Sequence, residues 1–216
     1  MEKTVIVTGG TVRIGAAISH CLRQNGWKVI TVSSRSDSAA DIIADLASEH
    51  ECGRIIDEAT RLSGGAAPLA LVNNAALFAG EKELVESINL RSPLRLIDLM
   101  KRCAAEDKMR RSIVNILDTR ILNRKNAGKP TPYEMSKLEL LKKTIELSRN
   151  ESEFLRVNAI APGPVLPPVQ IHEKSGRMLV ERPTAGDVAA GVLFLLETPS
   201  VTGTVIPVDA GQHLLH

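Results

Sequence analysis

Short runs of hydrophobic residues alternate along the chain with segments in which hydrophobic positions recur every three to four residues. The short runs are typical of buried strands, and the periodic segments are typical of amphipathic helices. Strands that alternate with helices indicate a parallel sheet covered by helices. The predicted strands are Thr4–Thr8, Lys28–Ser33, Ile42–Asp45, Leu69–Asn73, Ser112–Leu117, Leu155–Ile160 and Thr204–Val208, and the predicted helices are Arg13–Asn25, Glu49–Leu62, Glu81–Ala105, Pro132–Arg149 and Ala185–Glu197.

Two of the predicted helices begin at capping signals. Ser48 with Glu51, and Thr184 with Asp187, have the spacing of a capping box, in which each side chain accepts a hydrogen bond from the other residue's backbone amide. No internal repeat, low-complexity tract or linker divides the sequence. We therefore expect residues 1–216 to form a single α/β domain.

The connection between the second and third predicted strands is short. Only residues 34–41 separate the two strands, whereas a parallel crossover generally takes about a dozen residues and carries a helix. We expect this helix to be missing and the crossover to be a bare loop.

Composition narrows the class of protein. Hydrophobic residues make up 44% of the chain and charged residues 24%, as in ordinary soluble proteins, and no apolar run approaches the roughly 18 residues of a membrane helix. A net charge of +2 gives no general attraction to nucleic acid or membranes. The first strand begins by Thr4, without room for a signal peptide, and no cysteines form a C-x-x-C pair, so we expect a cytoplasmic protein without a metal site. The cysteines and the histidines without a partner at metal-ligand spacing are Cys21, Cys52, Cys103, His20, His172 and His213.

The stretch TVIVTGGTVRIGAAI, residues 4–18, begins as a buried strand and ends as a helix, with Gly9, Gly10 and Gly15 between them. Glycines tighten such a turn, and the helix N-terminus offers free amides and a partial positive charge to a pyrophosphate. The spacing is not G-x-G-x-x-G, and any turn of this kind can need glycine, so the turn alone leaves dinucleotide binding open. Arg13 stands inside the turn, where such loops usually keep a glycine.

The end of the second predicted strand indicates which dinucleotide would bind. An NAD site usually has an acidic residue there, which binds the ribose 2′-hydroxyl, but this chain has Ser34, Arg35 and Ser36. A guanidinium flanked by hydroxyls suits a 2′-phosphate, because it donates charge-assisted bonds in a planar fork. We expect Arg13 to reach the same phosphate, and therefore predict NADPH rather than NADH. The alternative is that both arginines are ordinary surface residues.

Tyr133, the single tyrosine of the chain, is followed at i+4 by Lys137 on the same face of a predicted helix. A phenol with a pKa near 10 is a poor acid or base at neutral pH. A neighbouring ammonium favours phenolate, so we expect Lys137 to lower the pKa of Tyr133. Alone, the pair could equally be a surface contact.

Together, these motifs resemble the short-chain dehydrogenase/reductase family. The matching segments are TGGTVRIG, the Asp45–Leu46 pair, NNA at 73–75, Asn89 in INL, Tyr133 with Lys137, NAIAPGPV at 158–165 and TGTVIPVDAGQ near the C-terminus. They occur in family order and extend over the whole chain.

The resemblance implies an NAD(P)-dependent oxidoreductase with a Rossmann-type, doubly wound parallel sheet of about seven strands. Tyr133 would donate the proton, Lys137 would hold the ribose hydroxyls and tune Tyr133, and Asn89 would order a water relay. Asp45 and Leu46 would flank the adenine. The full set of implied cofactor-binding residues is Gly9, Arg13, Ile14, Gly15, Ser34, Arg35, Ser36, Asp45, Leu46, Asn74, Ala75, Tyr133, Lys137, Pro162, Gly163 and Val165.

One departure from the family bears on the substrate. The family normally has a serine after the fifth strand, where this chain has Asp118 followed by Thr119, and either residue could take that place. A carboxylate cannot donate a hydrogen bond to a ketone, and its charge raises the pKa of Tyr133. Asp118 instead suits a substrate with N–H donors, or a C=N bond whose nitrogen is protonated as hydride arrives.

Arginine in the glycine turn, Arg-Ser after the second strand and aspartate for serine together resemble the pteridine reductase subgroup. Members of that subgroup have a phenylalanine shortly after NNA that stacks on the pterin, and Phe78 falls there; a core or lid phenylalanine is the alternative. Residues 166–183 are few for a substrate lid, and we expect one small helix near Gln170–Met178.

These features favour an NADPH-dependent reductase of a dihydropteridine-like substrate. Two alternatives remain: a carbonyl reductase for oxoacyl or small keto substrates that uses Thr119, and a non-catalytic sensor of NADP(H). Two predicted helices carry more apolar residues than one buried face requires, so we also expect a homodimer or homotetramer. Those residues are Leu94, Ile97, Leu138, Leu141 and Ile145.

Overall fold

The computed structural model describes residues 2–123, 128–150, 154–165 and 182–215. Its seven strands form one parallel sheet in the order β3-β2-β1-β4-β5-β6-β7. The chain builds outward from β1 in one direction and then in the other, so the predicted doubly wound α/β fold is confirmed. The strands are β1 Thr4–Thr8, β2 Lys28–Ser33, β3 Ile42–Ile43, β4 Ala70–Asn73, β5 Arg111–Ile116, β6 Leu155–Pro162 and β7 Val205–Val208.

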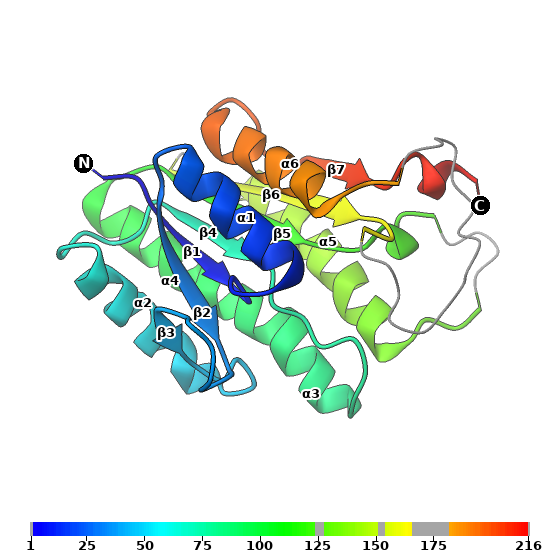
Figure 1. Ribbon diagram of the computed structural model, residues 1–216, viewed down its shortest axis with the longest axis horizontal. Coiled ribbons are helices and arrows are strands. Elements are labelled where there is room, and N and C mark those ends of the chain that lie inside the picture. The colour runs from blue at the N-terminus through cyan, green and yellow to red at the C-terminus, as the bar shows by residue number, and fades with distance from the viewer. Residues whose placement is uncertain (1, 124–127, 151–153, 166–181, 216) are drawn as a thin grey trace.

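Helices cover both faces of the sheet (Figure 1). Helices α1 and α6 pack against each other on one face, and α2, α4 and α5 lie on the other. The helices are α1 Arg13–Gln24, α2 Glu49–Leu62, α3 Lys82–Glu86, α4 Ser92–Asp107, α5 Pro132–Asn150 and α6 Ala185–Glu197, with short 3-10 turns at Thr119–Ile121 and Gln212–Leu214.

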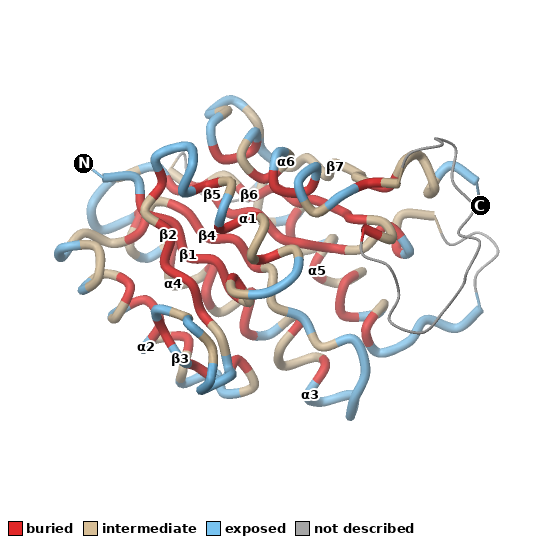
Figure 2. Tube along the Cα trace, in the orientation of Figure 1, coloured by how far each residue is buried: buried red, intermediate tan, exposed pale blue. Residues whose placement is uncertain are grey.

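The buried core follows from the alternation of side chains along the central strands. On β1, Val5 and Val7 pack with Ile18 of α1, whereas Ile6 between them packs with Ile55 of α2 on the opposite face. Figure 2 shows the strands buried through the middle of the molecule, with most exposed segments at turns and on outer helical surfaces. Burial on both faces explains why these strands are continuous hydrophobic runs in the sequence.

Most predicted boundaries agree with the structure to within one or two residues, but the third strand is shorter than predicted. The sequence predicted Ile42–Asp45, and only Ile42–Ile43 pair with β2 as a strand. Asp45 instead accepts a hydrogen bond from the amide of Ala47, which turns the chain towards α2. This turn leaves Asp45 exposed and Leu46 buried.

The helix predicted over Glu81–Ala105 is present over nearly these residues, but it is not one regular α-helix. The structure has α3, then a π-helical turn at Ser87–Arg91, then α4. Pro93, in the first turn of α4, has no amide hydrogen to donate to the carbonyl of Asn89, four residues earlier, so the regular helical ladder is interrupted there.

The crossover between β2 and β3 is a bare loop, as the sequence predicted, and residues 34–41 contain no helix. Asp41 ties this loop to the sheet: its carboxylate accepts from the backbone amide of Thr31 at 2.8 Å and from the Thr31 hydroxyl at 2.7 Å. The amide of Asp41 donates back to the same hydroxyl at 3.1 Å. These bonds hold the loop without a covering helix.

The two predicted capping boxes differ in outcome. Thr184 and Asp187 form the box, with the Thr184 hydroxyl accepting from the Asp187 amide at 3.2 Å and Asp187 accepting from the Thr184 amide at 2.7 Å. The box predicted for Ser48 is wrong, because no side-chain hydrogen bond caps α2 there. Glu51 instead pairs with Arg54, one turn further along the helix.

Within the described ranges, no helix is both long and apolar enough to cross a membrane, and no group of three or more histidine, cysteine or acidic side chains could hold a metal ion. His20 is exposed on α1, and His213 lies with Nδ1 2.9 Å from Oδ2 of buried Asp209. His172 and the small helix predicted near Gln170–Met178 lie outside the described residues.

Candidate active site

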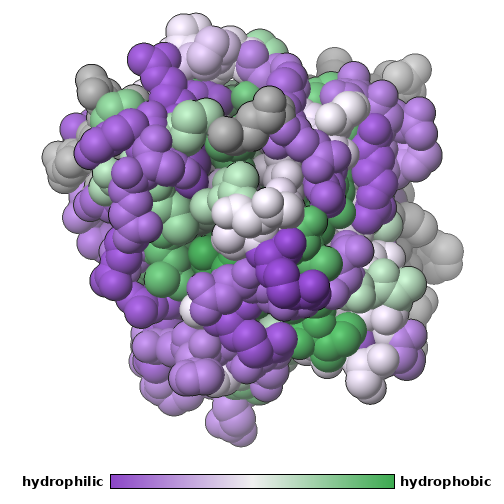
Figure 3. All heavy atoms as spheres, turned by 90° about the vertical axis from the view of Figure 1, so that its left-hand side faces the viewer, coloured by the Kyte–Doolittle hydropathy of each residue, from purple (hydrophilic) through white to green (hydrophobic). Residues whose placement is uncertain are grey.

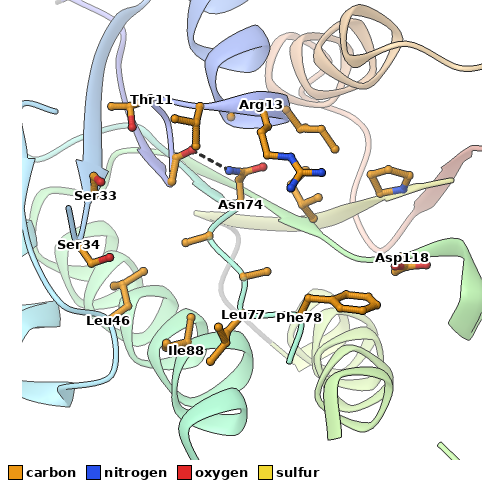
Figure 4. A pocket seen from close by; sticks show the side chains of 18 of the residues that line it. Thr11, Arg13, Ser33, Ser34, Leu46, Asn74, Leu77, Phe78, Ile88 and Asp118 are labelled. Carbon is orange, nitrogen blue, oxygen red and sulfur yellow. Dashed lines mark hydrogen bonds between the residues drawn. The ribbon is translucent and has the colours of Figure 1, made fainter. Parts of the chain in front are cut away.

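A cavity of about 540 Å³ lies at the carboxyl ends of the central strands, where the connections from β1 and β4 leave the sheet on opposite sides. Ligands bind at such a switch point in open α/β sheets. In Figure 4, Ser33, Ser34 and Leu46 lie at one end of the cavity, and Phe78 and Asp118 lie at the other. Arg13 and Asn74 lie between these two groups.

The glycine turn packs too closely for larger side chains. A Cβ on Gly15 would lie 2.0 Å from the carbonyl oxygen of Gly9, and Gly9 itself has a φ of 62°, in the left-handed region. No side chain caps the start of α1 at Val12, and its first turn contains no acidic residue. The helix therefore presents an uncapped, positively polarised N-terminus to the cavity.

Arg13 adds a full positive charge to this turn. Its backbone is left-handed, with a φ of 53°, and its side chain reaches into the cavity (Figure 4). The side-chain amide of Asn74 holds the other side of the turn, because its Nδ2 donates to the carbonyls of Thr8 at 2.9 Å and Gly9 at 3.1 Å. The turn is thus fixed by β4 as well as by α1.

Arg35 also lines the cavity, at the end where β2 stops. Its guanidinium is not free: Nε donates to Asp37 Oδ1 at 3.1 Å and Nη2 donates to Asp37 Oδ2 at 3.0 Å. Arg13 lies in the middle of the cavity in Figure 4, away from Ser34 at the β2 end. Convergence of both arginines on one phosphate therefore stays a prediction.

Tyr133 and Asp118 meet at the opposite end. Tyr133 is in the first turn of α5, and its hydroxyl donates to Asp118 Oδ2 at 3.1 Å. Asp118 follows β5, and its other oxygen accepts from the amide of Arg120 at 2.9 Å. Burial, followed by the charge of Asp118, raises the pKa of Tyr133 above its usual range. The Tyr133 phenol is therefore protonated at neutral pH.

Lys137 lies one helical turn after Tyr133 and is fully buried. Its Nζ donates to the carbonyl of Ile116 at 2.6 Å and lies 5.9 Å from the centroid of the Tyr133 ring. Burial lowers the pKa of Lys137 to about 8. The prediction that the pKa of Tyr133 is lowered by Lys137 is wrong for this structure: burial and Asp118 raise the pKa, and the cation that partly opposes them is Arg120. The predicted upward effect of Asp118 is confirmed.

Phe78 projects from the loop after β4 beside the proton donor. Its ring is 60% exposed, and its centroid lies 4.8 Å from that of Tyr133, with the planes tilted by 48°. The guanidinium of Arg120 lies 5.2 Å from the Phe78 centroid. An aromatic face is therefore available at the mouth of the cavity, next to the Tyr133 hydroxyl.

Asn89, in the π-helical turn, is buried behind this loop. Its side chain accepts from the amide of Leu77 and donates to the carbonyl of Leu77, both at 2.8 Å, and donates to Ser136 Oγ at 3.3 Å. Asn89 thus fixes the segment that carries Phe78 to the helix that carries Tyr133. A role of Asn89 in a water relay stays a prediction.

Nearly all the residues that the sequence singled out line one cavity. Ser36 and Asn89 are not among its lining residues in the described chain. Of the two candidates after β5, Asp118 lines the cavity and contacts Tyr133, while Thr119 is buried outside the lining. The predicted residues that line it are Gly9, Arg13, Ile14, Gly15, Ser34, Arg35, Asp45, Leu46, Asn74, Ala75, Phe78, Asp118, Tyr133, Lys137, Pro162, Gly163 and Val165.

Sequence reasoning missed several lining residues, among them Ser33, Leu77 and Ile88. Ser33 and Leu77 directly precede the predicted site residues Ser34 and Phe78, and this adjacency in the sequence could have identified them. Arg120 was also missed, because only the fold brings its guanidinium over Phe78.

Comparisons with known proteins agree with this architecture. A family model described as enoyl-(acyl carrier protein) reductase matches residues 12–213. Carbonyl reductase family member 4 of Xenopus tropicalis is 30% identical, over 99% of both chains, and 3-oxoacyl-(acyl-carrier-protein) reductase of Bos taurus is 29% identical, also over 99% of both. The crystal structure of FolM alternative dihydrofolate reductase 1 from Brucella suis, in complex with NADP, has a TM-score of 0.85 and 31% identity, over 99% of this chain and 96% of that one.

The matches extend through almost the whole chain, from the glycine turn to the C-terminal segment after β7. The chain belongs to the short-chain dehydrogenase/reductase family.

Proposed function

We propose that this protein is an NADPH-dependent reductase that acts on a C=N bond of a dihydropteridine-like heterocycle. The observation that carries the proposal is the hydrogen bond from Tyr133 to Asp118 beside the exposed ring of Phe78, in the same cavity as the glycine turn. In this proposal the cofactor binds at the end of the cavity formed after β1 and β2, and the reaction takes place at the end formed by Asp118 after β5 and Tyr133 of α5.

The cavity residues fit an NADP cofactor. The uncapped N-terminus of α1 suits the pyrophosphate, Arg35 at the end of β2 suits the 2′-phosphate, and the Arg13 side chain adds positive charge for the cofactor's phosphates. The relative from Brucella suis is itself described as a complex with NADP, which supports this choice. When bound, the cofactor would supply hydride to the substrate carbon.

The chain's own residues supply the proton. Tyr133, held protonated by burial and by Asp118, donates its hydroxyl proton to the substrate nitrogen. The hydroxyl proton, donated to Asp118 in this structure, would turn from the carboxylate to the substrate nitrogen, and Asp118 would stabilise the positive charge that develops on that nitrogen. Lys137, buried against Ile116, holds the ribose of the cofactor.

Phe78 provides the flat surface for the substrate. A planar heterocycle stacked on its ring gains about 0.5–1.5 kcal/mol beyond area burial. The exposed ring beside Tyr133 supports this role, and the name of the Brucella suis relative, a dihydrofolate reductase, is compatible with it.

Carbonyl reduction is the second candidate, because the relatives from Xenopus tropicalis and Bos taurus are named for carbonyl and 3-oxoacyl reduction. This candidate needs a hydroxyl donor at the position of Asp118. Thr119, the residue that sequence reasoning offered, is buried outside the cavity lining and has no contact with Tyr133 among the described hydrogen bonds. A non-catalytic sensor of NADP(H), the remaining alternative, would need neither a proton donor such as Tyr133 nor its hydrogen-bond partner Asp118.

The deciding experiment follows NADPH consumption with 7,8-dihydrobiopterin, with a small keto ester, and with neither. We expect oxidation of NADPH with the dihydropterin. Activity on the keto ester alone would replace the pteridine assignment with carbonyl reduction, and no activity on either would favour the sensor.

One substitution separates the two reactions. Asp118→Ser removes the carboxylate that favours a protonated nitrogen and opposes an oxyanion. Activity on the dihydropterin should therefore fall, while activity on the keto ester stays unchanged or rises. Phe78→Ala is the companion variant, and it should weaken dihydropterin binding but leave NADPH binding intact. A parallel loss on both substrates in Asp118→Ser would contradict the assigned role.

A further inference from the structure

In the short crossover after β2, Asp37 lies against Arg35, the arginine that lines the cavity where β2 ends. Arg35 and Asp37 make two hydrogen bonds, at 3.1 and 3.0 Å, in the fork-to-carboxylate arrangement that Arg35 would offer to a phosphate. The guanidinium holds the pKa of Asp37 below its usual range, so the carboxylate is charged at neutral pH.

This contact is part of a folded turn. The amide of Arg35 donates to Ser33 Oγ at 3.1 Å. The Ser38 hydroxyl and amide both donate to the carbonyl of Arg35, at 2.7 and 3.1 Å. The loop therefore presents Arg35 and Asp37 together, on the short path that replaces a crossover helix.

We propose that Asp37 is a specificity-determining residue that competes with the cofactor's 2′-phosphate for the Arg35 guanidinium. This inference rests on the proposed NADPH site. Because the same two nitrogens that bind Asp37 suit a phosphate, a bound 2′-phosphate must displace the carboxylate or share the fork with it. Asp37 thereby weakens NADPH binding and narrows its advantage over NADH.

The exposure of the pair makes the exchange possible. The side chains of Arg35 and Asp37 are 67% and 69% exposed, and a pair of this kind contributes little stability of its own. The carboxylate can therefore swing away at small cost. A phosphate dianion near Arg35 also experiences direct repulsion from Asp37 as long as the carboxylate stays in place.

The test measures cofactor affinity without any substrate. Asp37→Asn keeps the size of the side chain and removes its charge, and Asp57→Asn, on the exposed face of α2, is the control with the same change in net charge. Titration with NADPH and NADH at low salt should show a Kd for NADPH about three- to tenfold lower in Asp37→Asn. The Kd for NADH should stay within about twofold, and Asp57→Asn should match the unmodified protein.

A second background distinguishes competition from plain repulsion. In Arg35→Met, adding Asp37→Asn should change the Kd for NADPH by less than about twofold, because there is no longer a guanidinium for which the carboxylate and the 2′-phosphate compete. The proposal would be overturned if Asp37→Asn raised the affinity for NADPH equally in the Arg35→Met background. It would also be overturned if Asp37→Asn alone left that affinity unchanged or lowered it. If Arg35→Met leaves the preference for NADPH over NADH intact, the role of Arg35 in the proposed function fails as well. Adenosine 2′,5′-bisphosphate, as a fragment with the 2′-phosphate and no nicotinamide, should show the same gain as NADPH.

Discussion

At the scale of single residues, Tyr133 is the group on which the proposed chemistry depends. Tyr133→Phe keeps the ring against Phe78 but removes the hydroxyl that donates to Asp118. We expect NADPH-dependent turnover to fall by about 10²–10⁴ while the Kd for NADPH is unchanged. Stopped-flow or absorbance assays of NADPH oxidation measure the first quantity and fluorescence titration measures the second. Turnover close to that of the unmodified protein would remove Tyr133 from the role of acid.

Lys137 gives a pH dependence of stability that can be measured without ligands. Burial lowers its pKa from 10.5 to about 8. Below pH 8 the folded and unfolded chains both carry the proton, and folding must bury the charge. As the pH rises from about 8 to about 10.5, the folded protein releases this proton before the unfolded chain does, so the free energy of unfolding rises with pH, by about 3 kcal/mol for a shift of this size.

Lys137→Met isolates that contribution. Urea unfolding of the unmodified protein and of the variant, at pH 7 and pH 9.5, gives the difference between their free energies of unfolding at each pH. We expect the unmodified protein to gain stability relative to Lys137→Met between pH 7 and pH 9.5, because at pH 9.5 most folded molecules no longer bury a charged Lys137. Parallel pH profiles would contradict a lowered pKa for Lys137.

At the scale of elements, the two helix starts with the same sequence signal differ in structure. Thr184→Ala removes the side chain that accepts from the Asp187 amide, and it should lower the free energy of unfolding by about 1 kcal/mol. Ser48→Ala removes a hydroxyl that caps nothing, and it should have a much smaller effect. Urea unfolding of the two variants side by side tests this contrast. Equal losses would mean that Ser48 caps α2 in solution.

The π-helical turn links element geometry to the site. Pro93 leaves the backbone carbonyl of Asn89 without its usual helical donor, and the Asn89 side chain bonds to Leu77 and Ser136. Pattern alone predicts a continuous helix there, because the hydrophobic positions continue in phase across residues 87–91. The π-helical turn depends on which backbone carbonyl each amide reaches, and the hydrophobic pattern does not record that.

At the scale of the whole molecule, partly buried apolar residues on α4 and α5 bear on whether copies of this chain associate with one another. Leu94 on α4 and Leu138, Leu141 and Ile145 on α5 are only partly buried, whereas Ile97 is fully committed to the core, so its place among the surplus residues is wrong. By contrast, hydrophilic residues predominate on the face in Figure 3, which lies at the left of Figure 1 near α2 and β3.

We predict a homodimer or homotetramer that buries the apolar surface of α4 and α5. Light scattering at micromolar concentration should give a multiple of the 23.3 kDa chain mass. Leu141→Glu should shift the population towards the monomer, because it introduces a charge into that surface. A monomeric mass for the unmodified protein would count decisively against this assembly.

The sequence by itself determined the order of strands and helices and the residues of the candidate site. The runs of buried strands, the glycine turn and the pair of Tyr133 with Lys137 are local patterns, and local patterns are fixed by side-chain periodicity and backbone preference. The absence of a crossover helix could likewise be predicted, since residues 34–41 are too few to form one.

The tertiary structure alone decided which groups meet and how their environment changes them. It selected Asp118 over Thr119 as the partner of Tyr133, and it paired Arg35 with Asp37. It also decided between the two opposite effects expected on the pKa of Tyr133, in favour of an increase. Each of these outcomes depends on burial, or on how a loop folds back on itself, and neither is encoded in residue spacing. For Tyr133, desolvation by burial is the largest cause of the raised pKa, and burial is a property of the folded chain.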